Sequence, residues 1–510
     1  MDIDRSSMII LHPTALPGGH GIGDFGKNAY EWIDFLEETG VKIWQVLPFG
    51  PTDNIQFSPY SSSSSKLGNF ALIDLTYLAE IGIIEKEDLN NSPKNLSKIN
   101  FLDVYKFKES ILRKSHTNLY KDNKNTLHNE INEYEEVNPG LENELIFQMA
   151  TSLYGDDWKK WPEDLINPNK NTLKKFKEEN KEEYSYQLFV QFLFTKQLNK
   201  LNEYGSKKNV KILGDVPIYT NFHSCDVWMN KSLFDLEENY EMANVAGAAP
   251  DIFTAAGQIW GNPLYLWEEH KKENYKWWID RLNSCLSKYE LLRIDHFGGL
   301  FQFWAIPNGG LGVEGVWRKG PAKSFLEGIK DDIELERILA EDLFALDLDE
   351  MDEAREDFNI PGIKMLNQRI PHNSWDEEAP PSEWAYNCAA YTGTHDSPTT
   401  KQWLEETSDG QRKHFKEFVD NNLINKFDSD VWNAISVIWE TPCQLAGTLV
   451  QDLLELGKEA RFNIPGQQLG NWNWRLESLE PLNGIKDKLL KLNKDTKRIK
   501  LIIIFNIFNN

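Results

Sequence analysis

The sequence predicts an α/β fold, a (β/α)8 TIM barrel with helical insertions. Short, nearly continuous apolar runs alternate along the chain with segments of helical periodicity. Such runs are typical of strands that are buried on both faces, as in a parallel sheet. Several runs end in loops with acidic, proline or glycine residues, and in a barrel the carboxyl ends of the strands face the active site. A doubly wound α/β sheet is the alternative, because periodicity alone neither counts the strands nor closes the sheet.

Six apolar runs share the pattern of a strand that ends in a polar loop. Between two of these runs, residues 26–40 place their apolar side chains mostly on one face of a helix, and Gly40 is a stop signal. The runs comprise residues 8–11, 41–47 and 210–213, and the segments that end before Asp295, Glu341 and Asp396.

Part of the N-terminal half has a different composition. From about residue 77 to residue 200, Lys, Glu and Asn dominate, and long helical patterns follow one another. This composition predicts a mainly helical insertion over residues 77–200. Residues 1–76 would then begin the barrel, and residues 201–510 would complete it.

The composition also limits the partners. Hydrophobic residues make up 40% of the chain and charged residues 26%, which is typical of a globular fold. The net charge of −24 argues against nucleic acid and against an anionic membrane surface. It also disfavours a polyanionic substrate, whereas a neutral substrate fits. The 18 tryptophans favour a sugar ligand, since sugar-binding sites stack pyranose rings on aromatic faces.

The cysteines and the chain ends predict a cytoplasmic location. The N-terminal residues contain no long apolar segment typical of a secretory signal, and the apolar residues 501–510 are too few to span a bilayer. The four cysteines are far apart and form no CxxC pair, which favours reduced thiols. They are Cys225, Cys285, Cys388 and Cys443.

Two motifs resemble cofactor or metal sites without their context. Gly310, Gly312 and Gly315 match a dinucleotide-binding fingerprint, but we expect no strand before them and no helix after them. The acidic residues 347–358 lack the glycine of a calcium loop and predict a solvated helix start. Because signatures of zinc hydrolases, nucleotide-binding loops and serine hydrolases are also missing from the sequence, we expect no cofactor and no metal.

Three carboxylates after strand-like runs carry the chemistry. One acid after a strand is often a helix N-cap, but Asp295, Glu341 and Asp396 repeat the pattern, two of them beside His296 or His395. Carboxylates that converge shift one another's pKa, which is typical of active sites. Glycoside transfer needs such groups: one carboxylate attacks the anomeric carbon, and a protonated one gives its proton to the leaving oxygen.

The segments "RIDHF", "AEDL" and "YTGTHD", in this order, resemble the 4-α-glucanotransferases, the amylomaltase or disproportionating-enzyme family (glycoside hydrolase family 77). Further blocks such as "HPTALPGGHGIGDFG", "GDVPIY", "ARFNIPG" and "NWNWR" extend the resemblance over nearly the whole chain. The resemblance implies a TIM barrel with no separate C-terminal β domain, and a retaining double displacement through an enzyme-bound glucosyl intermediate. Donor and acceptor would be malto-oligosaccharides and glucose. We expect a monomer or a homodimer.

The resemblance also implies roles for the residues at the strand ends. Asp295 would be the nucleophile, Glu341 the general acid and then base, and Asp396 would stabilise the transition state through sugar hydroxyls. Arg293 would keep Asp295 ionised by a charge-assisted hydrogen bond, although a plain ion pair at a strand end is the alternative. His395 would bond the sugar at subsite −1.

Further substrate contacts are implied on other segments. Tyr60 resembles the aromatic residue that stacks on the acceptor glucan, although a core tyrosine is the alternative. Residues 247–262 resemble a mobile loop that covers the glucan, and Asp215 is either a sugar contact or a structural acid. The remaining implied contacts are Ser58, Asp251, Gln258, Trp260, Asn262, His296 and Asn463.

Two other functions are compatible with the same residues. A hydrolytic, amylase-like glycosidase would use water in place of the acceptor sugar, and a non-catalytic glucan-binding protein would keep the fold. The intact carboxylates favour an enzyme. Departures from the family pattern beside them bear on subsite geometry: Gly298, Phe344, Ser397 and Pro398.

Overall fold

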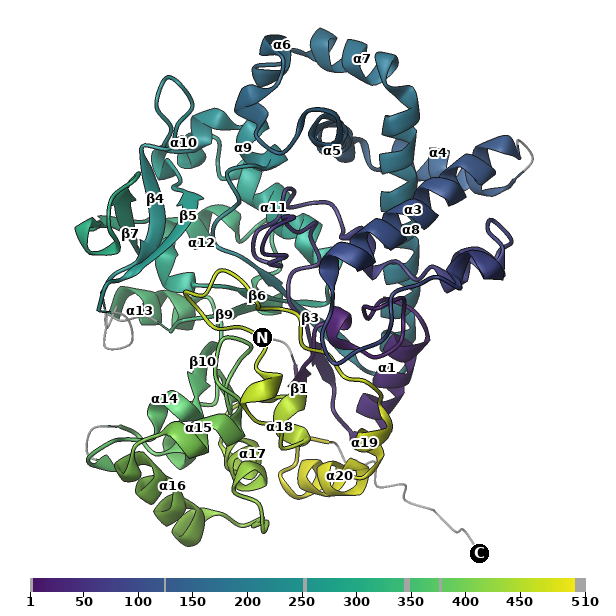
Figure 1. Cartoon of the computed structure of the whole chain (residues 1–510). Coiled ribbons are helices and arrows are strands. Elements are labelled where there is room, and N and C mark those ends of the chain that lie inside the picture. Colours follow the sequence, from purple (N-terminus) through teal and green to yellow (C-terminus); the bar gives the residue numbers. More distant parts are fainter. Residues whose placement is uncertain (1–2, 123–124, 251–254, 344–348, 376–377, 500–510) are drawn as a thin grey trace, which may run out of the picture.

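The computed structural model describes residues 3–122, 125–250, 255–343, 349–375 and 378–499 (Figure 1). Eight parallel strands form a nearly closed barrel in the order β10-β11-β12-β1-β2-β3-β6-β9, so that neighbours around the barrel are also neighbours in the order of the chain. The predicted barrel is confirmed. Its strands are β1 (Ser6–Ile10), β2 (Ile43–Gln45), β3 (Lys211–Val216), β6 (Leu291–Ile294), β9 (Ile338–Ala340), β10 (Gly362–Met365), β11 (Cys388–Tyr391) and β12 (Leu445–Leu449).

The apolar runs form strands because both of their faces are buried. One face of each strand points into the barrel, where side chains from all eight strands fill the interior. The other face packs against the surrounding helices in a second, larger core. The interior cluster comprises Met8, Ile10, Ile43, Leu213, Leu291, Leu339, Ile363, Met365, Ala389, Tyr391, Leu445 and Leu449.

The helices of the barrel follow its strands. α1 joins β1 to β2 and ends at Gly40, whose φ of 73° is the left-handed conformation that the predicted stop signal requires. α1 packs against α8 (Lys181–Lys207) and α20 (Lys486–Asp495) on the outside of the barrel. The helices that belong to the barrel part of the chain are α1 (Lys27–Thr39), α11 (Lys276–Leu286), α12 (Lys323–Ile329), α13 (Asp349–Asp357), α14 (Leu366–Arg369), α15 (Thr400–Glu406), α16 (Asp409–Asn422), α17 (Asp430–Glu440), α18 (Val450–Leu453), α19 (Glu480–Asn483) and α20 (Lys486–Asp495).

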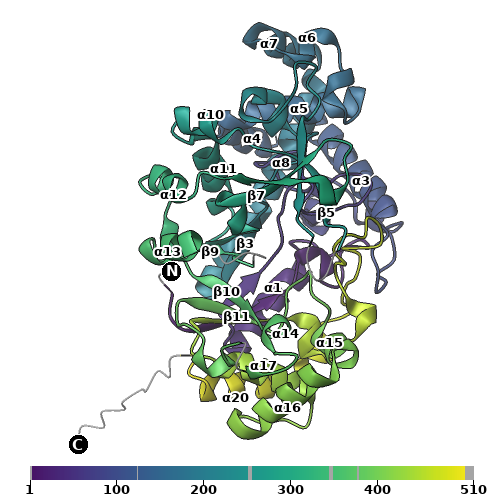
Figure 2. The ribbon, with the colours of Figure 1, turned by 90° about the vertical axis from the view of Figure 1, so that its left-hand side faces the viewer.

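The chain between β2 and β3 is mainly helical. α8 returns to the barrel and packs against β3 and α1. Figure 2 shows α5, α6 and α7 at one end of the elongated molecule and α16 and α20 at the other. That residues 77–200 form an insertion carried on the barrel stays a prediction. The helices of this segment are α2 (Thr76–Glu80), α3 (Phe101–Lys121), α4 (Leu127–Val137), α5 (Glu142–Tyr154), α6 (Glu163–Ile166), α7 (Lys170–Glu179) and α8 (Lys181–Lys207).

A second, antiparallel sheet stands beside the barrel and was not predicted. Its order is β5-β4-β7-β8, and it is inserted on both sides of β6 in the sequence. The segment predicted as a loop over residues 247–262 has its two ends in strands of this sheet. The elements are β4 (Asn244–Ala248), β5 (Gln258–Pro263), β7 (Gln302–Pro307) and β8 (Val316–Lys319), with α9 (Cys225–Met229) and α10 (Trp267–Lys272) nearby in the sequence.

The glycine motif lies in this second sheet. The expectation that no strand precedes Gly310 is wrong, because β7 ends at Pro307. Gly310, Gly312 and Gly315 instead connect β7 to the antiparallel β8, and a strand rather than a helix follows them. A dinucleotide-binding turn joins a strand to a helix, so that the motif stands in a different structural context.

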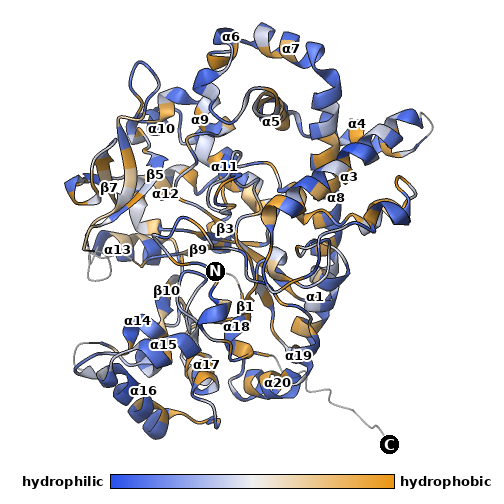
Figure 3. Cartoon of the chain, in the orientation of Figure 1, coloured by the Kyte–Doolittle hydropathy of each residue, from blue (hydrophilic) through white to orange (hydrophobic). Residues whose placement is uncertain are grey.

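Figure 3 shows α16, on the outside of the molecule, as largely hydrophilic. The four cysteines are free and buried. Within the described ranges, no helix combines the length and the apolar character that a membrane span requires.

Candidate active site

The residues predicted for the site in the barrel gather where its parallel strands end. The carboxyl ends of parallel strands meet at one end of a barrel, which explains why residues far apart in the sequence come together there. They are Asp215 in β3, Arg293 in β6, Asp295 directly after β6, Glu341 directly after β9, and His395 and Asp396 in the turn after β11.

A buried arginine links two carboxylates. Arg293 lies opposite Asp215 in the register of β6 and β3, and its Nη1 is 2.5 Å from Asp215 Oδ2. Its Nη2 is 2.9 Å from Oδ1 of Asp295, two residues further along and on the same side of the strand. The Arg293 side chain is 4% exposed, so its charge, close to Asp295, is little screened by solvent. Burial raises the pKa of Asp215 to about 6, against the opposing effect of Arg293.

Tyr60 connects this ion pair to the other side of the site. Its hydroxyl donates to Asp215 Oδ2 at 2.6 Å and lies 2.8 Å from His395 Nε2. The same Nε2 is 3.2 Å from Asp396 Oδ2, and the Asn463 amide donates to Asp396 Oδ1 at 2.6 Å. Burial alone would raise the pKa of Asp396, but His395 and Asn463 outweigh it and hold this pKa well below its usual range.

Glu341 has a different environment. Its Oε2 accepts a hydrogen bond from the main-chain N–H of His296 at 2.6 Å, and its side chain is buried. His296 has a φ of 48°, in the left-handed region, where a residue with a side chain is strained. Burial raises the pKa of Glu341 to about 8; Arg293 opposes this shift and Asp295 adds to it. The site therefore combines a carboxyl group whose pKa is raised, Glu341, with one whose pKa is lowered, Asp396.

The second sheet brings aromatic and amide groups to the same place. The ring centroids of Trp260 and His296 are 4.9 Å apart, and the rings lie edge to face. The Trp260 Nε1 donates to Gln258 Oε1 at 3.2 Å. Asn262 donates to the carbonyl of Thr220 at 2.8 Å. Gln258 and Trp260 are two residues apart in β5, and the strand then bulges between Ile259 and Pro263, where Gly261 has a φ of 77°. Trp260 is 37% exposed, which leaves its ring accessible to a ligand.

Two further predicted contacts have other surroundings. Ser58 is buried, and its hydroxyl accepts a hydrogen bond from the Tyr60 N–H at 3.2 Å, so it shapes the turn that holds Tyr60. Asp251 lies outside the described residues, and so does Phe344, one of the residues that depart from the family pattern. At the other departures, Gly298 is buried in a short 3-10 turn, and the Ser397 hydroxyl accepts from the Thr394 N–H at 3.1 Å.

The structure adds residues that sequence reasoning missed. Trp472 lies with its ring centroid 5.8 Å from that of Tyr60 and 6.1 Å from that of His395. Arg461 donates to the carbonyl of Asp396 at 3.2 Å and to that of Asn463 at 2.9 Å. Both belong to sequence blocks that carried the family resemblance, "NWNWR" and "ARFNIPG", and this signal could have singled them out.

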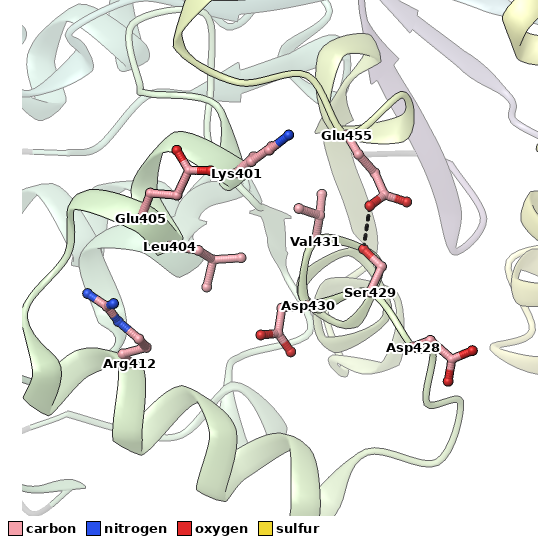
Figure 4. A pocket seen from close by; sticks show the side chains of 9 residues that line it. All are labelled: Lys401, Leu404, Glu405, Arg412, Asp428, Ser429, Asp430, Val431 and Glu455. Carbon is pink, nitrogen blue, oxygen red and sulfur yellow. Dashed lines mark hydrogen bonds between the residues drawn. The ribbon is translucent and has the colours of Figure 1, made fainter.

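A hollow lies among α15, α16 and α17, away from the residues predicted for the site (Figure 4). The Ser429 hydroxyl donates to Glu455 across it at 2.7 Å. None of the residues predicted for the site lines this hollow. The residues that line it are Lys401, Leu404, Glu405, Arg412, Asp428, Ser429, Asp430, Val431 and Glu455.

Across the described part of the chain, no group of three or more His, Cys, Asp and Glu side chains is arranged to hold a metal ion.

A barrel with carboxylates at its strand ends is typical of enzymes that act on glycosidic bonds, and comparison with known proteins identifies the family. The family model described as 4-alpha-glucanotransferase matches residues 11–481. A 4-alpha-glucanotransferase of Aquifex aeolicus is 36% identical over 483 residues, which cover 93% of this chain and 96% of the relative. One of Clostridium butyricum is 35% identical over 498 residues, covering 95% and 99%.

A solved structure agrees with these relatives. The amylomaltase of Streptococcus agalactiae, in complex with acarbose, superposes with a TM-score of 0.90 at 30% identity and covers 97% of this chain and 100% of its own. The chain belongs to the 4-α-glucanotransferase family. The resemblance found in the sequence is confirmed, and the hydrolytic alternative is not favoured.

Proposed function

We propose that this protein transfers a segment of a 1,4-α-glucan to the 4-hydroxyl of glucose or of another 1,4-α-glucan by a retaining double displacement. The observation that carries this proposal is the contrast between Asp295, paired with a guanidinium, and Glu341, whose raised pKa keeps it protonated. A nucleophile must be charged and a general acid must hold its proton, and this pair supplies both.

In the first step the Asp295 carboxylate attacks the anomeric carbon of the donor glucan. Glu341 gives its proton to the glycosidic oxygen as that bond breaks, and the reducing-end segment leaves with a free 4-hydroxyl. The product is a glucosyl ester of Asp295 with inverted configuration, and Glu341 is left as a carboxylate.

In the second step Glu341 acts as a base. It takes the proton from the 4-hydroxyl of the acceptor while the acceptor oxygen attacks the anomeric carbon and displaces Asp295. The second inversion restores the α-configuration, Asp295 is again a carboxylate and Glu341 is again protonated, so the cycle closes.

Other residues hold the sugar and the reacting groups. Asp396 and His395 bond hydroxyls of the sugar at subsite −1, Asn463 holds Asp396, and Arg293 orients Asp295. Asp215, which is 2% exposed and bonded to Arg293 and Tyr60, supports them without touching sugar. The remaining predicted contacts are Tyr60, Ser58, Asp251, Gln258, Trp260, Asn262 and His296.

Transfer is separated from hydrolysis by the products of pure maltotriose. Transfer yields glucose together with maltopentaose and longer chains, which chromatography resolves. Glucose and maltose alone would indicate hydrolysis. An unchanged maltotriose peak would contradict both activities for this donor.

The ligands and the setting complete the proposal. Neutral malto-oligosaccharides and glucose suit a chain with a net charge of −24 and exposed aromatic faces. The four buried, free cysteines support a reducing, cytoplasmic setting. We further propose a monomer or homodimer, which light scattering after size-exclusion chromatography distinguishes.

A further inference from the structure

The barrel has a seam between β9 and β10, the two strands at the ends of its ladder order. Across this seam the N–H of Ala340 donates to the carbonyl of Pro361 at 2.9 Å. A parallel ladder would continue this pairing along both strands. The next N–H of β10 along the seam, that of Ile363, however, donates to a side chain and not to a main-chain carbonyl.

That side chain is Asp342. Its Oδ1 accepts a hydrogen bond from the N–H of Ile363 at 2.7 Å. Its Oδ2 is 3.2 Å from Nε of Arg355, on α13, and both side chains are largely buried, at 7% and 14% exposure. The carboxylate therefore ties three elements together: the end of β9, the start of β10 and α13.

The start of β10 is shaped to receive this carboxylate. A Cβ atom at Gly362 would lie 2.1 Å from Asp342 Oδ2 and 2.8 Å from Arg355 Nη1. Real Cβ atoms do not approach so closely, so a side chain at this position would displace the ion pair. The glycine lets the carboxylate reach the Ile363 N–H directly.

Glu341 lies between the two residues that close the seam. Its own N–H donates to the carbonyl of Ile294 at 3.0 Å, and its carbonyl accepts from the N–H of Phe297 at 2.8 Å. These bonds tie it to β6 on one side, while Ala340 and Asp342 tie its neighbours to β10 on the other. The main chain of Glu341 is thus held from both sides of the barrel wall.

We propose that Asp342 is a positioning residue for Glu341, because it closes the barrel at the seam and holds the acid at the glycosidic oxygen. This inference rests on the acid role proposed above for Glu341. A misplacement of about 1 Å can cost about 100-fold in rate, so a loosened seam acts on the proton transfer. Asp342 itself touches no substrate.

The test compares two donors that differ in their need for a proton. Maltotriose needs protonation of its leaving oxygen, whereas α-maltosyl fluoride expels fluoride without an acid. First-turnover rates are measured with both donors, as product release and as fluoride release. The ratio of the fluoride rate to the maltotriose rate is taken within each preparation, so that a misfolded fraction cancels.

For Asp342→Ala we expect the maltotriose rate to fall about 100-fold and the ratio to rise at least about tenfold. Asp342→Asn keeps an oxygen that can accept from the N–H of Ile363. Its ratio should therefore lie between the ratios of Asp342→Ala and the wild type. Asp352→Asn is the matched control, since Asp352 is the other carboxylate on Arg355, with 2.6 Å between Oδ1 and Nη2, and is exposed. Its ratio should equal that of the wild type.

An unchanged ratio for Asp342→Ala would overturn the proposal, whether both rates persist or both fall equally. Glu341→Gln separates this failure from a failure of the acid role. If the ratio rises for Glu341→Gln but is unchanged for Asp342→Ala, Glu341 acts as the acid and Asp342 does not position it. An unchanged ratio for Glu341→Gln overturns the acid role itself, and with it the proposal for Asp342.

Discussion

The ends of β6 and β9 lie side by side in the barrel and carry the same functional group in different environments. Asp295, after β6, faces the guanidinium of Arg293 at 2.9 Å and is 25% exposed. Glu341, after β9, is 8% exposed and accepts from a neutral main-chain N–H. Burial raises the pKa of Glu341 even though Arg293 opposes this shift, so burial favours a carboxylic acid on β9. The surroundings of each carboxyl group, and not only the type of residue, therefore bear on its chemistry.

The largest expected effect comes from removing the charge at the end of β6. Asp295→Asn deletes the nucleophile and should lower kcat on maltotriose by at least about 10,000-fold. Because the shape of the side chain is kept, the affinity for malto-oligosaccharides, measured by calorimetry, should change by less than about tenfold. Full activity in this variant would show that the two carboxylates have been assigned wrongly.

The next effect concerns the partner that distinguishes Asp295 from Glu341. Arg293→Lys keeps a positive charge but loses the fork that reaches both Asp215 and Asp295, so kcat/KM should fall about 100-fold. Arg318→Lys is the control, because Arg318, in β8 of the second sheet, forms a more exposed pair with Asp235, which lies before β4. Equal effects of the two changes would contradict a special role for Arg293.

The pH dependence tests the other half of the comparison. The acid role requires protonated Glu341, and its pKa is raised to about 8. Raising the pH through this value removes the proton, so kcat/KM should fall about tenfold per unit above about pH 8. Initial rates on maltotriose from about pH 5 to about pH 10 measure this limb. A fall that begins below about pH 6 would contradict the raised pKa.

The smallest expected effect concerns the link between the Arg293 side of the site and Asp396. Tyr60→Phe removes the hydroxyl that bonds Asp215 and His395 but keeps the ring, so kcat should fall roughly tenfold. Tyr134→Phe is the matched control, since its hydroxyl bonds Thr195 between α4 and α8. If Tyr60→Phe behaves like this control, the link does not contribute to catalysis.

Much of the site was accessible from the sequence because it depends on local patterns. Acids that directly follow apolar runs predicted Asp295, Glu341 and Asp396, and the structure places them at the ends of β6 and β9 and in the turn after β11. The i, i+2 spacing predicted that Arg293 shares a side of the strand with Asp295, as the 2.9 Å contact requires. Their catalytic roles stay predictions that the variants above test.

Contacts across the barrel were beyond the reach of such patterns. Asn463 meets Asp396 over a separation of 67 residues, and Tyr60 meets Asp215 over 155. The antiparallel sheet was also missed, since the segment that holds β4 and β5 was interpreted as one loop and the end of β7 was not recognised as a strand. Gly247 and Gly261 interrupt the apolar pattern of β4 and β5, which weakens the local signal for strands.

By itself the sequence determined six of the barrel strands, the acids that follow three of them and the family to which the chain belongs. These follow from periodicity and from short motifs, which are properties of neighbouring residues. The tertiary structure decided that burial raises the pKa of Glu341, that Arg293 pairs with Asp295, and that Asp342 accepts from Ile363 across the seam beside Glu341. Burial and charge partners are set by residues that are distant in the chain, so they exist only once the barrel has closed.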